Sequence, residues 1–187
     1  MRVITGSARG LPLAAPKAGA RPTMDRVREA IFSSLGDAVP GSRVLDLFAG
    51  SGALGIEALS RGAASAVFVD SSPEAVRCIR RNLERTRLDG TIIRADAYRY
   101  LESCAEGIFD LIFADPPYAK RPGDRDFASE LAAAAAFARA LAGGGTAVIE
   151  CVPGRPPAAP DGLEMMGCRK YGTTAVVYFV KRIGGGE

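Results

Sequence analysis

One short stretch combines a carboxylate, two residues without N–H donors and an aromatic ring: Asp115, Pro116, Pro117 and Tyr118. They directly follow the apolar run 109–114, which is typical of a buried strand. Two successive prolines end the strand's hydrogen-bond ladder and leave carbonyl oxygens that can accept hydrogen bonds. Asp115 and the Pro116 carbonyl can each accept one hydrogen of a planar NH2 group while the Tyr118 ring stacks on its plane. Taken alone, the stretch is equally compatible with a simple turn at a strand exit.

A second pattern lies upstream, where residues 46–55 read DLFAGSGALG and contain G-x-G-x-x-G between an expected strand and an expected helix. Asp70 lies 20 residues after Gly50, as in the dinucleotide-binding fingerprint, so the spacing alone predicts NAD binding. Asp46, however, lies in the strand close to the turn, where a carboxylate repels a pyrophosphate and attracts an ammonium group. We also expect no second domain that could hold a substrate for hydride transfer.

S-adenosylmethionine, an adenosine that carries a cationic amino acid, fits these residues better than NAD. Gly50 and Gly52 let the backbone pass under its methionine part, while Asp70 suits the ribose hydroxyls and Asp96 the adenine amino group. With Asp46, Asp70, Asp96 and Asp115, four carboxylates follow or end successive expected strands, the edge at which α/β sheets bind ligands. The expected cofactor contacts are Asp46, Phe48, Ala49, Gly50, Ser51, Gly52, Asp70, Ser71, Asp96 and Ala97.

The expected chemistry is methyl transfer to an exocyclic base amine. A sulfonium is already an activated methyl donor, so no metal is needed. Hydrogen bonds from the amine to Asp115 and the Pro116 carbonyl favour a pyramidal nitrogen, and Asp115 can receive the departing proton. The chain has no histidine, and its four cysteines contain no Cys-x-x-Cys pair. This composition excludes the usual zinc sites, Ser-His-Asp triads and a histidine general base.

Alternation of strand and helix from residue 43 onward predicts an α/β fold with a parallel sheet and helices on both faces. The expected strands are 44–48, 66–70, 91–94, 109–114, 146–150, 164–170 and 174–181, of which the last two form an antiparallel pair. The expected helices are 24–35, 52–61, one that begins at Pro73, 98–104 and 127–141. Residues 2–5 and 10–14 predict a hairpin, Thr23 an N-cap, and Gly143–Gly145 a break before the next strand.

Length and charge bound the remaining possibilities. At 187 residues the chain is expected to form one domain. No apolar run reaches membrane-spanning length and no secretory signal opens the chain, so we expect a cytoplasmic protein. Residues 1–43 carry seven Lys or Arg against three Asp or Glu, whereas the remainder carries 17 against 18. A basic arm on a nearly neutral body indicates a polyanionic partner, although a solvated surface explains it almost as well.

The combination of Asp46-x-Phe48-x-Gly50-Ser51-Gly52 with Asp115-Pro116-Pro117-Tyr118 resembles the amino-methyltransferases of nucleic acids. The segment 21–32, RPTMDRVREAIF, narrows the resemblance to the RsmD family, the guanine-N2 methyltransferases of small-subunit (16S) ribosomal RNA. The resemblance implies S-adenosylmethionine as cofactor and a Rossmann-like class I methyltransferase fold with a mostly parallel seven-stranded sheet. It also implies a single domain over 1–187, with an N-terminal hairpin arm (residues 1–22) and a Rossmann-like core over 43–182.

The same resemblance extends the candidate sites. It places the Arg-Pro-Thr segment near the cofactor, so that Arg21, Thr23 and Arg26 become cofactor or RNA candidates. The expected RNA-binding residues are Arg2, Arg9, Lys17, Arg21, Lys120 and Arg121. The implied partner is ribosomal RNA or a small-subunit assembly intermediate, bound by a monomer without metal or membrane. The family often has Glu at the position of Asp70, whose shorter side chain would hold the ribose more loosely.

Other classes of protein explain parts of the pattern. A DNA adenine or cytosine amino-methyltransferase uses the same Asp-Pro-Pro-Tyr but normally carries an additional target-recognition region, for which no insertion here is long enough. An NAD-binding Rossmann oxidoreductase is the alternative that would bind a different cofactor at the same glycine-rich turn. The hypothesis of a non-catalytic RNA-binding protein explains the basic arm but does not explain the four carboxylates at the strand ends.

Overall fold

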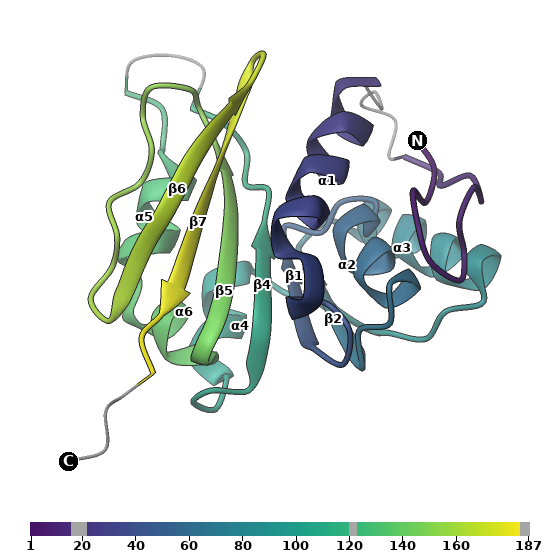
Figure 1. Ribbon diagram of the computed structural model, residues 1–187, viewed down its shortest axis with the longest axis horizontal. Helices are drawn as coiled ribbons and strands as arrows, with labels where there is room; N and C mark the ends of the chain where they lie inside the picture. Colours follow the sequence, from purple (N-terminus) through teal and green to yellow (C-terminus); the bar gives the residue numbers. More distant parts are fainter. Residues whose placement is uncertain (16–21, 120–122, 184–187) are drawn as a thin grey trace. The chain divides into compact units, whose positions relative to one another are not determined.

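The computed structural model describes residues 1–15, 22–119 and 123–183, with only the backbone described for 22–24. Its elements are α1 (Pro22–Leu35), the 3₁₀ turn η1 (Gly36–Ala38), β1 (Arg43–Leu47), α2 (Ala53–Ser60), β2 (Ser65–Asp70), α3 (Pro73–Thr86), β3 (Thr91–Arg94), α4 (Ala97–Ser103), β4 (Phe109–Ala114), α5 (Phe127–Ala133), α6 (Ala135–Ala140), β5 (Leu141–Cys151), β6 (Leu163–Tyr171) and β7 (Thr174–Lys181). The strand order is β3-β2-β1-β4-β5-β7-β6. Figure 1 shows the strands β4, β5, β7 and β6 of the second unit in this order. The chain divides into two compact units, Met1–Ala97 and Tyr98–Glu187.

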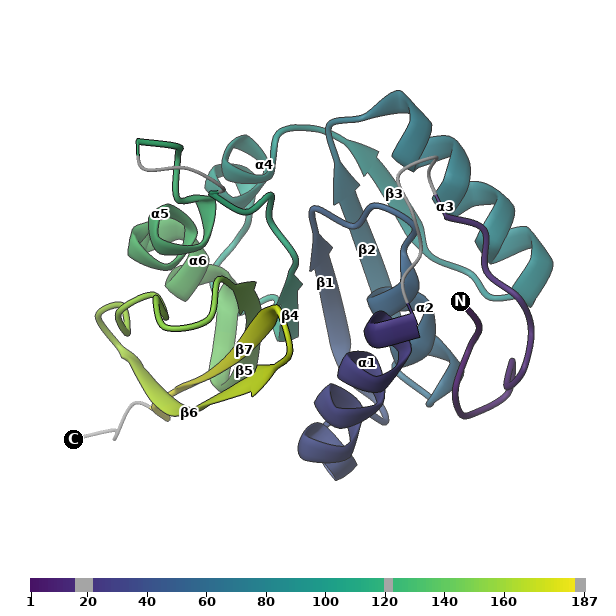
Figure 2. The ribbon, with the colours of Figure 1, turned by 90° about the horizontal axis from the view of Figure 1, so that it is seen from above.

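The first unit is built on three parallel strands. β1 pairs with β2 from Arg43↔Ser65 to Leu47↔Val69, and β2 pairs with β3. Four successive residues of β1, Val44 to Leu47, are buried, as expected for a parallel strand covered on both faces. The helices α2 and α3 pack against these strands (Figure 2). Helix α3 begins as the sequence predicts, because Ser72 accepts hydrogen bonds from two backbone N–H groups and Pro73 occupies the first position.

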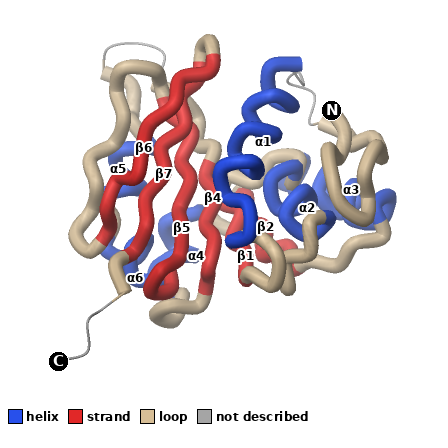
Figure 3. The backbone as a smooth tube through the Cα atoms, in the orientation of Figure 1, coloured by secondary structure: helices blue, strands red, loops and turns tan. Residues whose placement is uncertain are grey.

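The second unit joins a parallel pair to an antiparallel hairpin. β4 runs parallel to β5, whereas β7 runs antiparallel to both β5 and β6. The helices α5 and α6 pack against β5, and the strands β5, β7 and β6 lie side by side (Figure 3). Most residues of β6 are exposed, including Glu164, Arg169 and Lys170. Charged side chains of this kind protect an exposed sheet edge from pairing with other chains.

The described part of the arm, residues 1–15, is fastened to the first unit by buried polar side chains. Both carboxylate oxygens of Glu57, which is fully buried, accept backbone N–H groups of the arm: Ile4 at 2.7 Å and Thr5 at 3.0 Å. The hydroxyl of Ser60 accepts from the Ala8 N–H at 3.0 Å and donates to the Thr5 carbonyl at 2.6 Å. The expected hairpin is confirmed in a short form, with the antiparallel bridge Arg2↔Pro12. The Val3 N–H donates to the Leu11 carbonyl at 3.0 Å, and the Gly10 N–H donates to the Val3 carbonyl at 2.9 Å.

Most expected elements are confirmed, and the differences have local causes. The expected helix 127–141 is two helices, because Ala134 is extended at φ −74° and ψ 117°. The expected break at Gly143–Gly145 lies within β5, where the register against β4 shifts between Phe109 and Leu111. Helix α1 begins at Pro22, so Thr23 lies inside its first turn instead of preceding it as N-cap. Among the described residues, no helix is both long and apolar enough to cross a membrane.

Candidate functional site

The glycine turn (residues 48–52) is held by the carboxylate of Asp70 at the end of β2. One oxygen of Asp70 accepts the Gly50 N–H at 2.8 Å, and the other accepts the Ser72 N–H at 2.8 Å. Asp70 thus joins the turn after β1 to the N-cap of α3. Its side chain is half-buried, and each carboxylate oxygen can accept a second hydrogen bond. The residue can therefore organise the turn and still bind a ligand hydroxyl.

Asp46 plays a structural part that its sequence position does not reveal. Its side chain is 1% exposed, and Oδ2 accepts the Gly55 N–H in the first turn of α2 at 2.9 Å. The N-cap of α2 is Gly52, which has no side chain to accept this bond. Asp46 therefore caps α2 from the neighbouring strand. Burial raises the pKa of Asp46 to about 8, the Gly55 hydrogen bond lowers it, and the charge of Asp70 raises it.

The two glycines of the Gly-Ser-Gly turn serve different purposes, although both have positive φ. A Cβ on Gly50 would meet only the Phe48 carbonyl oxygen, at 3.8 Å, so a ligand has room above this residue. A Cβ on Gly52 would come within 3.3 Å of the side chains of Ile79 and Phe68, inside the first unit. Gly50 thus offers space for a ligand, whereas Gly52 provides space for packing. A valine at position 52 would accordingly disturb the fold itself.

The other cofactor candidates differ in accessibility. Asp96 and Ser71 are exposed, whereas Ala49 and Ala97 are buried and can offer little beyond their backbone. The ends of β2 and β3 adjoin, because the Ala95 N–H donates to the Asp70 carbonyl at 3.3 Å. Phe48 has φ +55°, an unfavourable conformation for a bulky residue that is often found at functional turns. The Ser51 carbonyl accepts a hydrogen bond from Asn82 Nδ2 at 2.9 Å.

In the second unit, the exit segment (Asp115–Tyr118) leaves β4 with its aromatic ring anchored. Asp115 is half-buried, Pro116 buried and Pro117 exposed. The Tyr118 hydroxyl lies 3.2 Å from Oε2 of Glu150 and in hydrogen-bond contact with the Thr174 hydroxyl. The sequence predicts a stacking role for the ring but gives no partner for the hydroxyl. The structure supplies two, from the end of β5 and the start of β7.

The environment of this cluster disfavours negative charge. Burial raises the pKa of Tyr118 far above its usual range. Burial also raises the pKa of Glu150, against the opposing effect of hydrogen bonds from Thr174 and Tyr118. Tyr118 therefore stays a neutral phenol at any physiological pH. Its role is limited to packing, stacking and hydrogen bonding.

The predicted RNA-binding residues are only partly described. Arg2, Arg9 and Arg26 are exposed. The side chain of Thr23 and residues Lys17, Arg21, Lys120 and Arg121 lie outside the described residues. A second group of exposed arginines, outside the predicted RNA-binding residues, lies on one solvent-facing side of α3: Arg77, Arg80, Arg81 and Arg85.

Two buried polar residues that connect the arm with the core are absent from the sequence-based list of site residues. Asn82 exchanges hydrogen bonds with Ala14, through the Ala14 N–H at 2.8 Å and the Ala14 carbonyl at 3.0 Å. Because Asn82 also binds the Ser51 carbonyl, one amide links the arm to the glycine turn. Glu57, which binds the arm, lies between Ile56 and Ala58. A carboxylate in so apolar a stretch of helix is the signal that could have identified it, since a buried charge needs partners.

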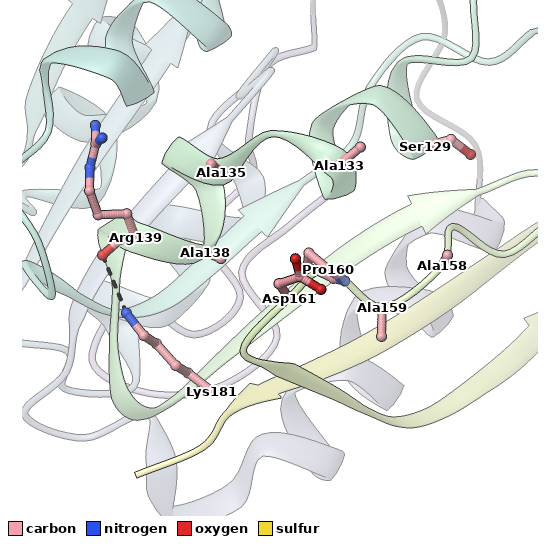
Figure 4. Close-up of a pocket in the computed structure, with 10 residues that line it drawn as sticks. All are labelled: Ser129, Ala133, Ala135, Ala138, Arg139, Ala158, Ala159, Pro160, Asp161 and Lys181. Atoms are coloured by element: carbon pink, nitrogen blue, oxygen red, sulfur yellow. Dashed lines mark hydrogen bonds between the residues drawn. The ribbon is translucent and has the colours of Figure 1, made fainter. Parts of the chain in front are cut away.

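A groove of about 660 Å³ in the second unit lies apart from these residues. Alanines of α5 and α6 face Ala158–Asp161 across it, with Arg139 and Lys181 at one end (Figure 4). Lys181 ends β7, whereas Thr174, which contacts Tyr118, begins it. The groove therefore lies at the other end of this strand and contains no predicted site residue. Among the described residues, no group of three or more Cys, Asp or Glu could hold a metal ion.

Known proteins are similar to this chain in sequence and in fold. A family model described as "Conserved hypothetical protein 95" matches residues 1–180. "Putative rRNA methyltransferase YlbH" of Bacillus subtilis is 47% identical over 123 residues, 63% of this chain and 67% of the relative. "Ribosomal RNA small subunit methyltransferase D" of Escherichia coli is 37% identical over 120 residues, 63% of this chain and 60% of the relative. The solved structure of "Putative methyltransferase yhhF" from Escherichia coli has a TM-score of 0.84 at 29% identity and covers 98% of both chains.

These similarities confirm the expected fold and family. The matches to the first curated relatives span about half to two thirds of the relatives' length. The structural likeness covers nearly the whole chain and confirms a class I methyltransferase fold with a mostly parallel seven-stranded sheet. The family model extends from the arm to the last residues of β7. The chain belongs to this family of conserved hypothetical proteins, the RsmD family.

Proposed function

We propose that this protein is an S-adenosylmethionine-dependent methyltransferase that modifies the exocyclic N2 amine of a guanine in 16S ribosomal RNA. The observation that carries the proposal is the exit segment, which presents a carboxylate and an anchored aromatic ring directly after a buried strand. The names of the curated relatives support ribosomal RNA as the substrate class.

The glycine turn fits the proposed cofactor. There is open space at Gly50, half-buried Asp70 stands beside it, and exposed Asp96 follows the next strand. Carboxylate oxygens at these two positions suit the hydroxyls of a ribose and the amino group of an adenine. Asp46, capping α2 beneath the turn, would be driven toward its ionised form by a bound ammonium group. When bound, S-adenosylmethionine supplies a methyl group already activated on a sulfonium.

The exit segment has groups suited to an acceptor amine. Asp115 and the Pro116 carbonyl are the proposed acceptors for its two hydrogens, and their hydrogen bonds would fix its orientation. Asp115 is also the proposed acceptor of the proton that the amine releases. Tyr118 offers a ring face for stacking, because its hydroxyl is held by Glu150 and Thr174.

The basic residues supply the proposed contact with RNA phosphates. Arg2 and Arg9 are exposed, whereas the arm is bound to the first unit through hydrogen bonds to the side chains of Glu57 and Ser60. The two guanidinium groups can therefore neutralise phosphates without breaking these bonds. We extend this role to Lys17, Arg21, Lys120 and Arg121 and give Thr23 and Arg26 a role near the cofactor. We further propose one domain, a monomeric state and a cytoplasmic location, with rRNA or an assembling small-subunit particle as the partner.

The proposal is tested with purified protein, S-adenosylmethionine carrying a labelled methyl group, and nucleic acids prepared without the modification. We expect label in 16S rRNA, as the free RNA or in a particle, and N2-methylguanosine after digestion to nucleosides. Label in adenine or cytosine of DNA would instead favour the DNA amino-methyltransferase. Calorimetric binding of NAD but not of S-adenosylmethionine would overturn the methyltransferase proposal.

A further inference from the structure

The hydroxyls of Tyr118 and Thr174 and one oxygen of Glu150 form a closed triangle of contacts in the second unit. The Tyr118 and Thr174 hydroxyls each lie 3.2 Å from Oε2 of Glu150, and the two hydroxyls contact each other. Each of the three oxygens is thus within hydrogen-bond reach of the other two. The triangle joins the exit segment to the strands β5 and β7.

The backbone of the β5–β7 pair fixes two corners of this triangle. Glu150 pairs with Val176 and Cys151 with Ala175, so Thr174 lies just beyond the end of the paired region. Both residues belong to the most regular part of the second unit, whereas Tyr118 belongs to an irregular segment after two prolines. The ring of Tyr118 therefore obtains its orientation from the sheet through its hydroxyl.

A count of protons shows what the triangle requires. The two hydroxyls bring two protons, and an ionised Glu150 brings none, so one of the three close oxygen pairs would lack a hydrogen. If Oε2 carries a proton, each oxygen donates one hydrogen bond and accepts one, and all three contacts are satisfied. An uncompensated oxygen pair in a partly buried site is unfavourable, and burial acts on the pKa of Glu150 in the same direction.

We propose that Glu150 is a neutral carboxylic acid that, together with Thr174, positions the Tyr118 ring for the target base. This inference rests on the proposed function, because Tyr118 is assigned to base stacking there. Glu150 and Thr174 do not touch the base themselves in this account. They act on the reaction only by holding Tyr118, and the proton on Glu150 closes the ring of three hydrogen bonds.

The protonation state is tested without any activity measurement. The infrared difference spectrum between the wild-type protein and Glu150→Gln at neutral pH should contain the C=O stretch of a carboxylic acid. The partly protonated Asp46 is common to both proteins, so its band cancels. The matched change at an exposed glutamate, Glu164→Gln, should give only a carboxylate band. A carboxylate band for Glu150 as well would overturn the neutral acid.

The positioning role is tested by a double-mutant cycle with methyl transfer as the readout. Thr174→Val and Glu150→Ala should each lower kcat roughly tenfold, about the effect of one buried hydrogen bond, with little change in the KM for the cofactor. Thr174→Ser should restore most of the rate, and Thr173→Val, at the exposed neighbour, should be silent. In a Tyr118→Phe background the two substitutions should have almost no further effect, because the hydroxyl through which they act is gone.

The outcomes separate this inference from the proposed function. Equal losses in the wild-type and Tyr118→Phe backgrounds would show that Glu150 and Thr174 act by another route and would overturn the positioning role. A folded wild-type protein that methylates no nucleic acid would end the proposed function, and the positioning role with it. The infrared band would even then decide whether Glu150 is neutral.

Discussion

The glycine turn and the exit segment both follow buried parallel strands, yet they are held in place in opposite ways. In the glycine turn, the backbone N–H of Gly50 donates to the carboxylate of Asp70. Next to the turn, Asp70 also accepts the Ser72 N–H, and Asp46 accepts the Gly55 N–H in α2. The exit segment has no N–H group at either of its prolines. Its aromatic ring is held through a side-chain hydroxyl, that of Tyr118.

This difference indicates how each region should respond to substitution. A turn held through its backbone depends on two carboxylates and on glycine conformation, and it tolerates many side chains at the other positions. In the exit segment, the anchoring of the ring depends on single atoms of Tyr118 and its two partners. We therefore expect substitutions at the glycine turn to change cofactor affinity and substitutions at the exit segment to change the rate of methyl transfer.

The largest expected effect is on the exit segment. Asp115→Ala removes an acceptor for the amine and should slow methyl transfer on the order of 10²-fold or more, with cofactor affinity unchanged. Asp115→Asn keeps the size but loses the charge, and it should be nearly as slow if Asp115 accepts the proton. Both expectations are checked by measuring the methyl-transfer rate of each variant at saturating cofactor, with the cofactor affinity measured by calorimetry as the control. An Asn variant near the wild-type rate would reduce Asp115 to a simple hydrogen-bond acceptor.

The second effect belongs to the glycine turn. Asp70→Asn keeps one acceptor oxygen but turns an NH2 group toward a backbone N–H of Gly50 or Ser72. Loss of one charge-assisted hydrogen bond should weaken cofactor binding about 10- to 100-fold. The rate at saturating cofactor should stay near the wild-type value. A changed rate with unchanged affinity would contradict the division of tasks between the two regions.

The third effect concerns the stability of the first unit. The pKa of Asp46 is about 8 in the folded protein against a reference value of 3.8, so the fold binds a proton that the unfolded chain releases. Its contribution to stability is present at pH 4 and is lost as the pH rises toward 8. Asp46→Asn still offers an oxygen to the Gly55 N–H but does not titrate. Urea unfolding at a series of pH values should show a flatter profile for this variant, and parallel profiles would show that Asp46 is ionised in the fold.

The smallest expected effects concern RNA binding. Arg2→Ala with Arg9→Ala should weaken binding and lower the salt slope by about one for each lost phosphate contact, with cofactor affinity unchanged. Arg77→Ala with Arg81→Ala removes the same charge from α3 and is the matched control. It should change the slope little and stabilise the helix slightly, since like charges four residues apart repel. If the two double variants have equal salt slopes of RNA binding, the arm has no specific contact with RNA phosphates and is only a charged, solvated surface.

The sequence predicts the framework well because local signals delimit it. The strands Thr91–Arg94, Phe109–Ala114 and Thr174–Lys181 have the predicted bounds. Apolar residues between Gly, Asp and Pro signals define them, and Ser72-Pro73 defines the start of α3. The division of the alanine-rich run at Ala134 could not be predicted, because the residues on both sides favour helix equally.

Long-range pairing of polar side chains explains what the sequence leaves out. Tyr118 and Thr174 are 56 residues apart, and Asn82 and Ala14 are 68 apart. No periodicity predicts such partners. One consequence concerns Tyr118→Phe, which the sequence predicts to be mild because stacking needs only the ring. Since the hydroxyl fixes the ring in the structure, we now expect this variant to lose part of the rate.

The most direct test of the central claim compares ribosomal RNA from a strain that lacks the gene with RNA from strains that carry the wild-type or the Asp115→Ala gene. Mass-spectrometric mapping of 16S rRNA should find one N2-methylguanosine that is absent without the gene. The wild-type gene should restore it, and the Asp115→Ala gene should not, although the variant is folded and binds the cofactor. Restoration by Asp115→Ala, or an unchanged methylation pattern in the strain without the gene, would contradict the account.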